Sequence, residues 1–208
     1  GVQNTIQTNA TYGTISGGYL NTIQTNSSGA TISGGVQNTI PLYAHYGTIG
    51  GGYQNTIQPY AQFATIPGGQ GNSAHDYAFA AGRRAKANHT GAFVWADNTD
   101  ADFASTAARQ FLIRASGGVG IGTTSPEVTL AISSDSTALT GVDLFNTTTP
   151  DGTSGYRLQL VGSDYPARAG SLELWKMPGT SLLTCMANGN VGIGTDSPAA
   201  RLHVAGDT

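Results

Sequence analysis

The sequence predicts an all-β protein in which a parallel β-roll, or β-helix, of 17-residue repeats is followed by small β modules. Three observations support this class. A phrase close to T-I-x-G-G-x-x-N-T-I recurs at a fixed interval through the first third of the 208-residue chain. Glycine, at 30 residues, is about twice as frequent as in ordinary domains. Further along, apolar and polar residues alternate with a period of two. A fixed internal period of this kind is typical of solenoids.

The repeat is built from columns of identical residues. Its isoleucines alternate nine and eight residues apart, so each repeat holds two half-units, N-T-I and (G/A)-T-I. Each half-unit is too short and too β-branched for a helix, so we expect two strands per repeat with Ile inward and Thr outward. Gly-Gly pairs such as Gly17-Gly18 would supply one turn, because glycine accepts a positive φ. The columns are Gly1, Gly18, Gly35, Gly52 and Gly69; Asn4, Asn21, Asn38, Asn55 and Asn72; Ile6, Ile23, Ile40 and Ile57; and Ile15, Ile32, Ile49 and Ile66.

No charged residue occurs from Gly1 to His75. In a stack of identical rungs about 4.8 Å apart, a column of like charges would repel itself, so an uncharged stack is expected. Asparagine columns would form amide ladders, and isoleucine columns would form a thin core. The alternative is a disordered polar linker, which would not keep two isoleucines in register over four repeats. A roll this thin has open ends, so we expect other chains to complete it.

The pattern changes after the repeats. In 74-AHDYAFAAGRRAKANHTGAFVWAD-97 alanine alternates and the first charges appear. This stretch resembles the last coils of YadA-like trimeric adhesin heads, whose repeats run A-x-A-x-G-x-x-A-x-A. We therefore expect a roll over residues 1–96, with five 17-residue units and then Ala-rich terminal coils. Residues 97–132 would form a connector that contains a short helix over 102–109.

A second motif, V-G-I-G-T-x-S-P-x-x-x-L-x-(V/I), begins at Val119 and again at Val191. It resembles a signature of phage-type tail fibres and related bacterial surface fibres, where it often precedes a self-cleaving trimerisation chaperone. The resemblance covers the chain except for roughly 133–187. It implies an intertwined homotrimeric fibre and an extracellular location, on a virion tail or on a bacterial cell surface. Each motif is expected to make a tight strand crossing near the trimer axis.

The segment between the two motifs has a different pattern. V-D-L-F-N, Y-R-L-Q-L-V and S-L-E-L-W-K-M alternate with a period of two, and the turn-rich T-P-D-G and M-P-G-T separate them. Residues 133–187 are therefore predicted to form an antiparallel β insert. Residues 188–208 contain the second V-G-I-G-T module.

Aromatic residues in the predicted turns are candidate glycan or receptor contacts. Tyr43, Tyr60 and Tyr77 are assigned to one repeat position, and Tyr46 and Phe63 lie three residues further on. On a polar, uncharged surface such rings could stack against sugar faces. The alternative is that they cover the edge of the roll or pack between chains.

A cluster of basic and acidic residues follows the uncharged repeats. The basic residues could attract phosphate or anionic glycans. The acidic residues close by favour intersubunit ion pairs that fix the rotation of the chains, because arginine forks suit carboxylates. The cluster comprises Arg83, Arg84, Lys86, Asp97, Asp100 and Asp102.

Enzymatic and cofactor chemistry is not expected. The glycine-rich 117-GGVGIGT-123 lacks the order of a phosphate-binding loop and has no βαβ context. No G-x-S-x-G occurs, and the four histidines and Cys185 are scattered. We therefore expect no catalytic, cofactor or metal site within the chain; a structural ion on a three-fold axis stays open. Net charge −3 gives no general reason to bind nucleic acid, and no apolar stretch is long enough for membrane insertion.

The sequence thus predicts a structural or adhesive segment of a trimeric surface or tail fibre that projects or forms a receptor-binding surface for host attachment. Its partners would be two further copies of itself and a cell-surface glycan or protein receptor. One alternative is an ice-binding β-solenoid, because threonines form ranks on an uncharged face. Another is a polysaccharide-depolymerising tailspike segment, which needs clustered carboxylates that residues 1–75 lack. The ranks are Thr5, Thr22, Thr39 and Thr56, and Thr14, Thr31, Thr48 and Thr65.

Overall fold

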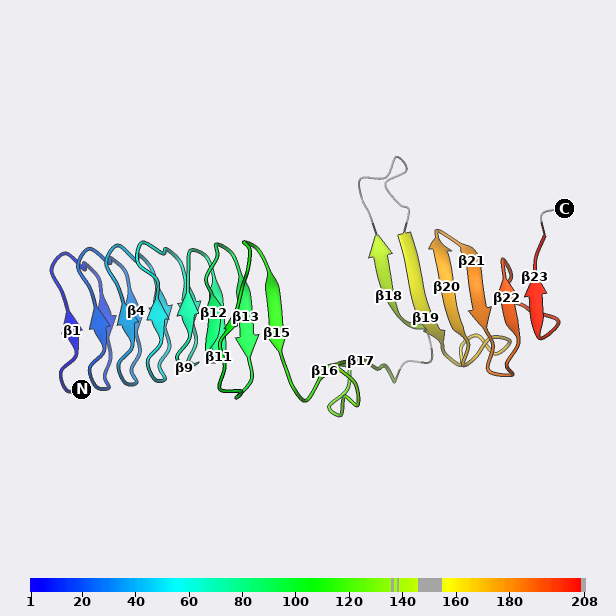
Figure 1. Ribbon diagram of the computed structural model, residues 1–208, viewed down its shortest axis with the longest axis horizontal. Coiled ribbons are helices and arrows are strands. Elements are labelled where there is room, and N and C mark those ends of the chain that lie inside the picture. Colours follow the sequence, from blue (N-terminus) through cyan, green and yellow to red (C-terminus); the bar gives the residue numbers. More distant parts are fainter. Residues whose placement is uncertain (136, 138, 146–154, 207–208) are drawn as a thin grey trace. The chain divides into compact units, whose positions relative to one another are not determined.

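The computed structural model describes residues 1–135, 137, 139–145 and 155–206 (Figure 1). Within these residues every regular element is a β-strand and none is a helix. The chain divides into two compact units, Gly1–Ser116 and Gly117–Thr208. The first unit is a parallel β-solenoid, which confirms the predicted all-β class and the stacking of the repeats.

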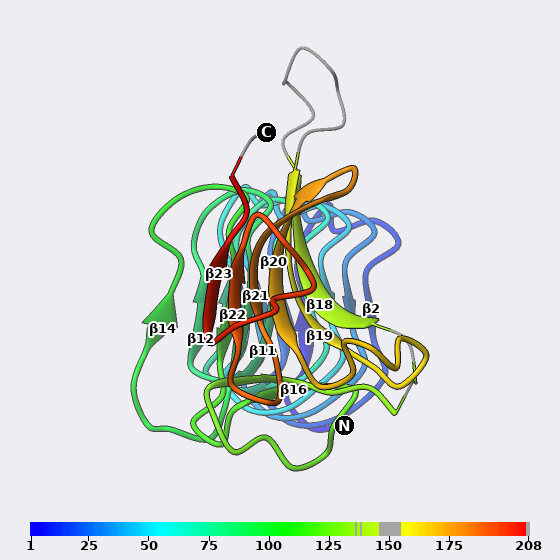
Figure 2. The same cartoon turned by 90° about the vertical axis from the view of Figure 1, so that its right-hand side faces the viewer.

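The solenoid consists of two parallel sheets that share every coil. Figure 2 looks along the stack and shows successive coils superposed. The first sheet has the order β1 (Thr5–Ile6), β3 (Thr22–Ile23), β5 (Thr39–Ile40), β7 (Thr56–Ile57), β10 (Ser73–Ala74), β12 (Ala85–Ala87) and β14 (Phe103–Ala104). The second has the order β2 (Thr14–Ile15), β4 (Thr31–Ile32), β6 (Thr48–Ile49), β8 (Thr65–Ile66), β11 (Phe79–Arg83), β13 (Phe93–Ala96) and β15 (Phe111–Arg114), and β9 (Gly69–Gln70) also pairs with β11.

The core is a double file of side chains between the sheets. Thr pairs with Thr and Ile with Ile between coils, and the repeat isoleucines from Ile23 to Ile66 are fully buried. Ile6, in the first coil, is 45% exposed because only one neighbouring coil covers it. Beyond Ile66 alanine takes over the inward positions, together with Val94. Two residues per strand therefore suffice, because each coil is paired on both sides.

Buried asparagines form hydrogen bonds between coils along one edge of the stack. The Asn55 side chain is fully buried, and its Oδ1 accepts a hydrogen bond of 2.9 Å from the backbone amide of Asn72. Its Nδ2 donates to the carbonyls of Gly51 and Gly69, at 2.9 Å each. Asn21 and Asn38 repeat the pattern. The bonds therefore run from each amide side chain to the backbone of the next coil, and not from one amide side chain to another as predicted.

One glycine in each coil cannot carry a side chain. Gly52 has a φ of +90°, and a Cβ there would lie 2.1 Å from the carbonyl oxygen of Gly69. The close approach is what lets the Asn55 amide reach the next coil. The same geometry at Gly35 and Gly69 explains why the column is invariant in the repeats.

The last coils of the solenoid depart from the length of the repeat. Gly69 pairs with Gly82 and Phe79 with Phe93, so these coils are shorter, whereas the pairing of Phe93 with Phe111 closes a slightly longer one.

The helix predicted over 102–109 is wrong. Residues 103–104 form β14, in which Phe103 pairs with Ala85, and turns follow. The Ser105 hydroxyl then accepts the amide of Asn88 at 3.0 Å, so pairing with the preceding coil overrides local helix preference.

In the second unit each V-G-I-G-T motif makes a pair of short parallel strands. β16 (Val119–Ile121) pairs with β17 (Leu130–Ile132), and β22 (Val191–Ile193) pairs with β23 (Leu202–Val204) in the equivalent register. A Cβ on Gly120 would lie 2.4 Å from the Thr123 carbonyl oxygen, and one on Gly192 would lie 2.5 Å from that of Thr195. This contact explains the central glycine of the motif. The place of either motif relative to a trimer axis stays a prediction.

A six-stranded sheet forms the rest of the second unit. β18 (Leu139–Phe145), β19 (Gly155–Val161), β20 (Leu172–Met177) and β21 (Thr180–Cys185) are antiparallel neighbours, as the alternation predicts. β22 adds to β21 in the antiparallel sense, so the second motif continues the same sheet. The predicted T-P-D-G turn lies outside the described residues.

Candidate functional site

The turn aromatics of the solenoid form two ladders. Tyr43 and Tyr60 stack with ring centroids 5.4 Å apart and planes 7° apart. Tyr46, Phe63 and Tyr77 form the second ladder, with spacings of 5.1 and 5.2 Å. All five residues have φ between +53° and +63°, the left-handed conformation of a sharp turn.

The assignment of Tyr77 to the column of Tyr43 and Tyr60 is wrong. Tyr77 stacks on Phe63 instead, because the coil that joins them is shorter than the repeat. Its amide bonds to the Gln62 carbonyl, just as the amide of Phe63 bonds to the His45 carbonyl one coil earlier. Counting with a constant period therefore places Tyr77 one corner of the coil away from the corner that it occupies in the structure.

Stacking decides which part of each ring meets solvent. Both faces of Phe63 pack against neighbouring rings, and Tyr46 is flanked by Phe63 and by Gly29, where a Cβ would lie 2.7 Å from its ring. The five residues are still 41–64% exposed. The ladders therefore offer sugars hydroxyl groups and few free ring faces. Glycan contact at these residues stays a prediction.

The charged cluster assembles within one chain. Arg84 Nε lies 2.7 Å from Asp102 Oδ1, and its Nη1 lies 3.1 Å from Asp100 Oδ1. Arg83 Nη2 is 3.0 Å from the same Asp100 oxygen, and Lys86 Nζ is 3.9 Å from Asp102. The hydrogen bond from Arg84 holds the pKa of Asp102 below its usual value. The cations are thus neutralised locally, and pairing between subunits stays a prediction.

Asp97 stabilises the last coil through hydrogen bonds and an ion pair. The backbone amides of Ser116 and Thr99 donate to its carboxylate at 2.8 and 3.1 Å, and these bonds hold the pKa of Asp97 well below its usual range. Arg114 Nε lies 3.1 Å from Asp97 Oδ1. Arg114 was not singled out from the sequence. Its separation from Asp97, which equals the period of the repeat, is the signal that could have indicated it.

A second group of functional interest lies on the six-stranded sheet and was missed from the sequence. Glu173 of β20 is fully buried. It accepts hydrogen bonds from Arg168 Nη1 at 2.9 and 3.0 Å, Gln159 Nε2 at 2.9 Å, Ser171 Oγ at 2.9 Å and Trp175 Nε1 at 2.6 Å. Gln159 lies opposite Glu173 in the strand register, and Trp175 follows on the same face. A buried carboxylate with so many donors fixes the side chains around it.

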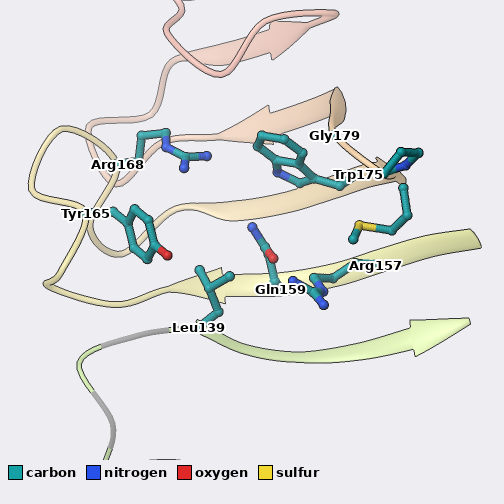
Figure 3. A pocket seen from close by; sticks show the side chains of 9 residues that line it. Leu139, Arg157, Gln159, Tyr165, Arg168, Trp175 and Gly179 are labelled. Atoms are coloured by element: carbon teal, nitrogen blue, oxygen red, sulfur yellow. The ribbon is translucent and has the colours of Figure 1, made fainter.

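Three of the side chains that bond to Glu173, namely Gln159, Arg168 and Trp175, border a cavity of about 180 Å³. Figure 3 shows Tyr165 and Arg168 entering from the loop after β19, and Gln159, Trp175 and Arg157 entering from strands. Its lining residues are Leu139, Arg157, Gln159, Tyr165, Arg168, Trp175, Met177, Pro178 and Gly179.

Both guanidinium groups in the cavity wall are held in place. The Arg168 guanidinium lies 5.5 Å from the Tyr165 ring centre and 5.3 Å from that of Trp175. Arg157 forms a bidentate salt bridge with Asp143, in which Nε lies 2.5 Å from Oδ1 and Nη2 lies 2.7 Å from Oδ2. The hydrogen bond from Arg157 lowers the pKa of the Asp143 carboxyl.

The opposite face of this sheet is apolar and uncovered in the described part of the chain. The strand registers place its large side chains on one side, across all six strands. Their exposed fractions reach 66% at Leu144. The exposed members are Val142, Leu144, Tyr156, Leu158, Leu160, Leu172, Leu183, Ile193, Leu202 and Val204. We call this surface the apolar face.

The described residues contain no candidate metal-ligand group and no candidate membrane-spanning helix. No group of three or more His, Cys, Asp or Glu side chains is placed to hold a metal ion there. None of the described segments is a helix long and apolar enough to cross a membrane.

Comparisons with known proteins return nothing for this chain: no protein-family model matches it, and neither a curated protein nor a solved structure does.

Proposed function

We propose that this chain is a non-enzymatic structural and adhesive segment of an extracellular homotrimeric fibre that attaches to a cell surface. The observation that carries the proposal is the apolar face. Ten large apolar side chains that are 37–66% exposed on one sheet face are far more than a soluble monomer commonly leaves uncovered. A second and a third copy of the chain, which carry the same face, would cover it.

The solenoid supports the same assembly. On the second sheet the threonine column continues from Thr65 into Phe79, Phe93 and Phe111, which stack at 4.6 and 4.5 Å. Trp95 is 38% exposed beside them. We infer that this sheet faces the sister chains.

The other sheet has the opposite character at the same end of the solenoid. Its threonine column continues from Thr56 into Ser73 and then Lys86. Lys86 lies beside the ion pairs of Arg84 and Asp102. A charged surface is well hydrated, so the column of Thr5 to Thr56 would face solvent.

The test is the mass of the purified chain in solution. Light scattering coupled to size-exclusion chromatography at micromolar concentration is expected to give three times the chain mass of 21.2 kDa. A stable monomer would contradict the proposal. Adhesion is tested separately, by binding of the labelled trimer to bacterial cells.

An ice-binding role is the second candidate, because the structure aligns Thr5, Thr22 and Thr39 in register on one flat sheet. The rank is one residue wide, so it presents a row rather than a lattice of hydroxyl and methyl groups. Appreciable thermal hysteresis in a solution of the purified chain would favour this role over attachment.

A further inference from the structure

We propose that the cavity on the polar face of the six-stranded sheet binds one neutral sugar residue of a cell-surface glycan. The inference rests on the proposed attachment function and deepens it by naming a site and a ligand class. It moves the glycan site from the turn aromatics, whose ring faces are largely covered, to the second unit.

The cavity combines the two surfaces that a sugar ring requires. Leu139 and the rings of Trp175 and Tyr165 supply apolar wall, which suits the C–H face of a pyranose. Arg168 lies over each of the two rings, so a sugar would use the ring surface that Arg168 leaves free. Gln159 and Arg157 supply planar polar groups, which suit pairs of neighbouring hydroxyls. Pockets of this kind, mostly apolar with few convergent polar groups, are typical of small-molecule sites.

The polar groups are already fixed in position. Gln159 is 4% exposed, and its Nε2 donates to Glu173, so its Oε1 lies outside this bond and can accept another. The Nε and Nη2 atoms of Arg157 bond to Asp143, so Nη1 lies outside this pair and can donate. A ligand would therefore lose little free energy in ordering the site.

The charged side chains around the cavity favour a neutral ligand. The two guanidinium groups are each paired, Arg157 with Asp143 and Arg168 with Glu173. Asp196 lies 3.7 Å from Arg168 as a third carboxylate. A phosphate or a sugar acid would meet no uncompensated positive charge and would have to compete with these carboxylates.

Size and placement agree with this ligand. The volume of about 180 Å³ is below the roughly 300–1,000 Å³ of pockets for drug-sized ligands, so it suits a ligand as small as one sugar residue. Gln159 and Trp175 point to the side opposite Leu158 and Leu174, because neighbouring strand residues alternate. The cavity would thus stay open when other copies cover the apolar face.

Saturation-transfer NMR with the full chain tests the site. The probes are glucose, galactose, mannose, N-acetylglucosamine and N-acetylgalactosamine, with sialic acid and inorganic phosphate as anionic comparisons. We expect at least one neutral sugar to receive saturation. Tyr165→Ala removes a wall and Leu139→Trp fills the cavity, and each is expected to weaken binding at least tenfold while circular dichroism stays unchanged.

Tyr60→Ala is the matched control, because it removes an aromatic side chain that is 63% exposed in the turn ladder. It should leave the signal intact. Loss of the signal in Tyr60→Ala alone, transfer only to the anions, or no transfer to any sugar would overturn the inference. Chain mass measured on the same samples separates the two proposals, since a trimer that binds no sugar contradicts only this one.

Discussion

At the scale of single residues, the asparagine column links the coils through buried hydrogen bonds. Each of these side chains accepts a hydrogen bond from one backbone amide and donates to two backbone carbonyls, as Asn55 does with Asn72, Gly51 and Gly69. Buried backbone groups need such partners, so an uncharged amide that both donates and accepts is well suited to the position.

Asn55→Ala should therefore lower the free energy of unfolding by about 2–4 kcal/mol, because each buried polar group left without a partner costs about 1–3 kcal/mol. Chemical denaturation measures the loss. Gln62→Ala, a substitution of an exposed polar residue at another corner of the coil, is the control and should change stability by less than about 0.5 kcal/mol. Equal losses in both variants would contradict the ladder.

Asp97 makes the last coil sensitive to acid. Its pKa is lower in the folded chain than the usual value of about 3.9, so its contribution to stability is present above that pH. The contribution is lost as pH falls through the folded pKa. Thermal melts should show a falling unfolding temperature below about pH 4.

Asp97→Asn should be less stable than the parent at neutral pH and should lose less stability on acidification. The exposed Glu127→Gln, by comparison, should follow the parent chain throughout. An acid profile of Asp97→Asn that matches the parent would show that other carboxylates control this transition.

At the scale of elements, a strand of two residues is stable only through its neighbours. β5 is paired on both sides and its Ile40 is fully buried, whereas β1 has one neighbour and its Ile6 is 45% exposed. The same residue in the same column thus has a different environment inside the stack and at its first coil.

Ile40→Ala is expected to cost about 2–5 kcal/mol, because it leaves a cavity between two tightly paired sheets. Ile6→Ala makes the identical change at the first coil and should cost less than half as much. Denaturation of the two variants side by side provides the measurement. Similar costs would mean that burial does not vary along the column.

The 17-residue period correctly predicts the strands of the regular coils. It does not predict the coils whose length differs from the repeat. Two strands per repeat, inward isoleucines and the glycine turn follow from the evenly spaced columns. Tyr77 and β14 do not, because the coil length changes after Gly69 and the register then depends on pairing with the previous coil.

The six-stranded sheet of the second unit shows the same division. Its strands were indicated by the alternation of apolar and polar residues. Its buried Glu173 was not, because Ser171, Gln159 and Arg168 become neighbours only through cross-strand pairing and the loop after β19.

At the scale of the whole molecule, both units have one apolar and one polar surface. In the first the division runs between the Phe79 side and the Lys86 side of the solenoid, and in the second between the apolar face and the cavity side. A chain of this kind is expected to be stable chiefly as an assembly, because copies cover each other's apolar surfaces.

The double variant Leu158→Glu with Leu160→Glu tests this expectation. Both side chains are half exposed, at 51% and 53%, so the sheet should still form in a single chain. The carboxylates would be buried without partners in an assembly, and the light-scattering mass should fall to that of a monomer. Ser163→Glu, in the exposed loop after β19, should keep the mass of the parent. A trimer in the double variant would place the contact elsewhere.

The sequence alone specifies the rungs of the solenoid: which residues stack, which turn and which are buried. It could do so because a strict period makes each residue's neighbours copies of itself, so a local pattern specifies a distant contact. Tertiary structure alone sets the ladder that Tyr77 joins, the pairing of Asp97 with Arg114, the cavity lined by Gln159 and Trp175, and the apolar face. Those features depend on registers between unlike strands and on coils of unequal length, which no repeated column encodes.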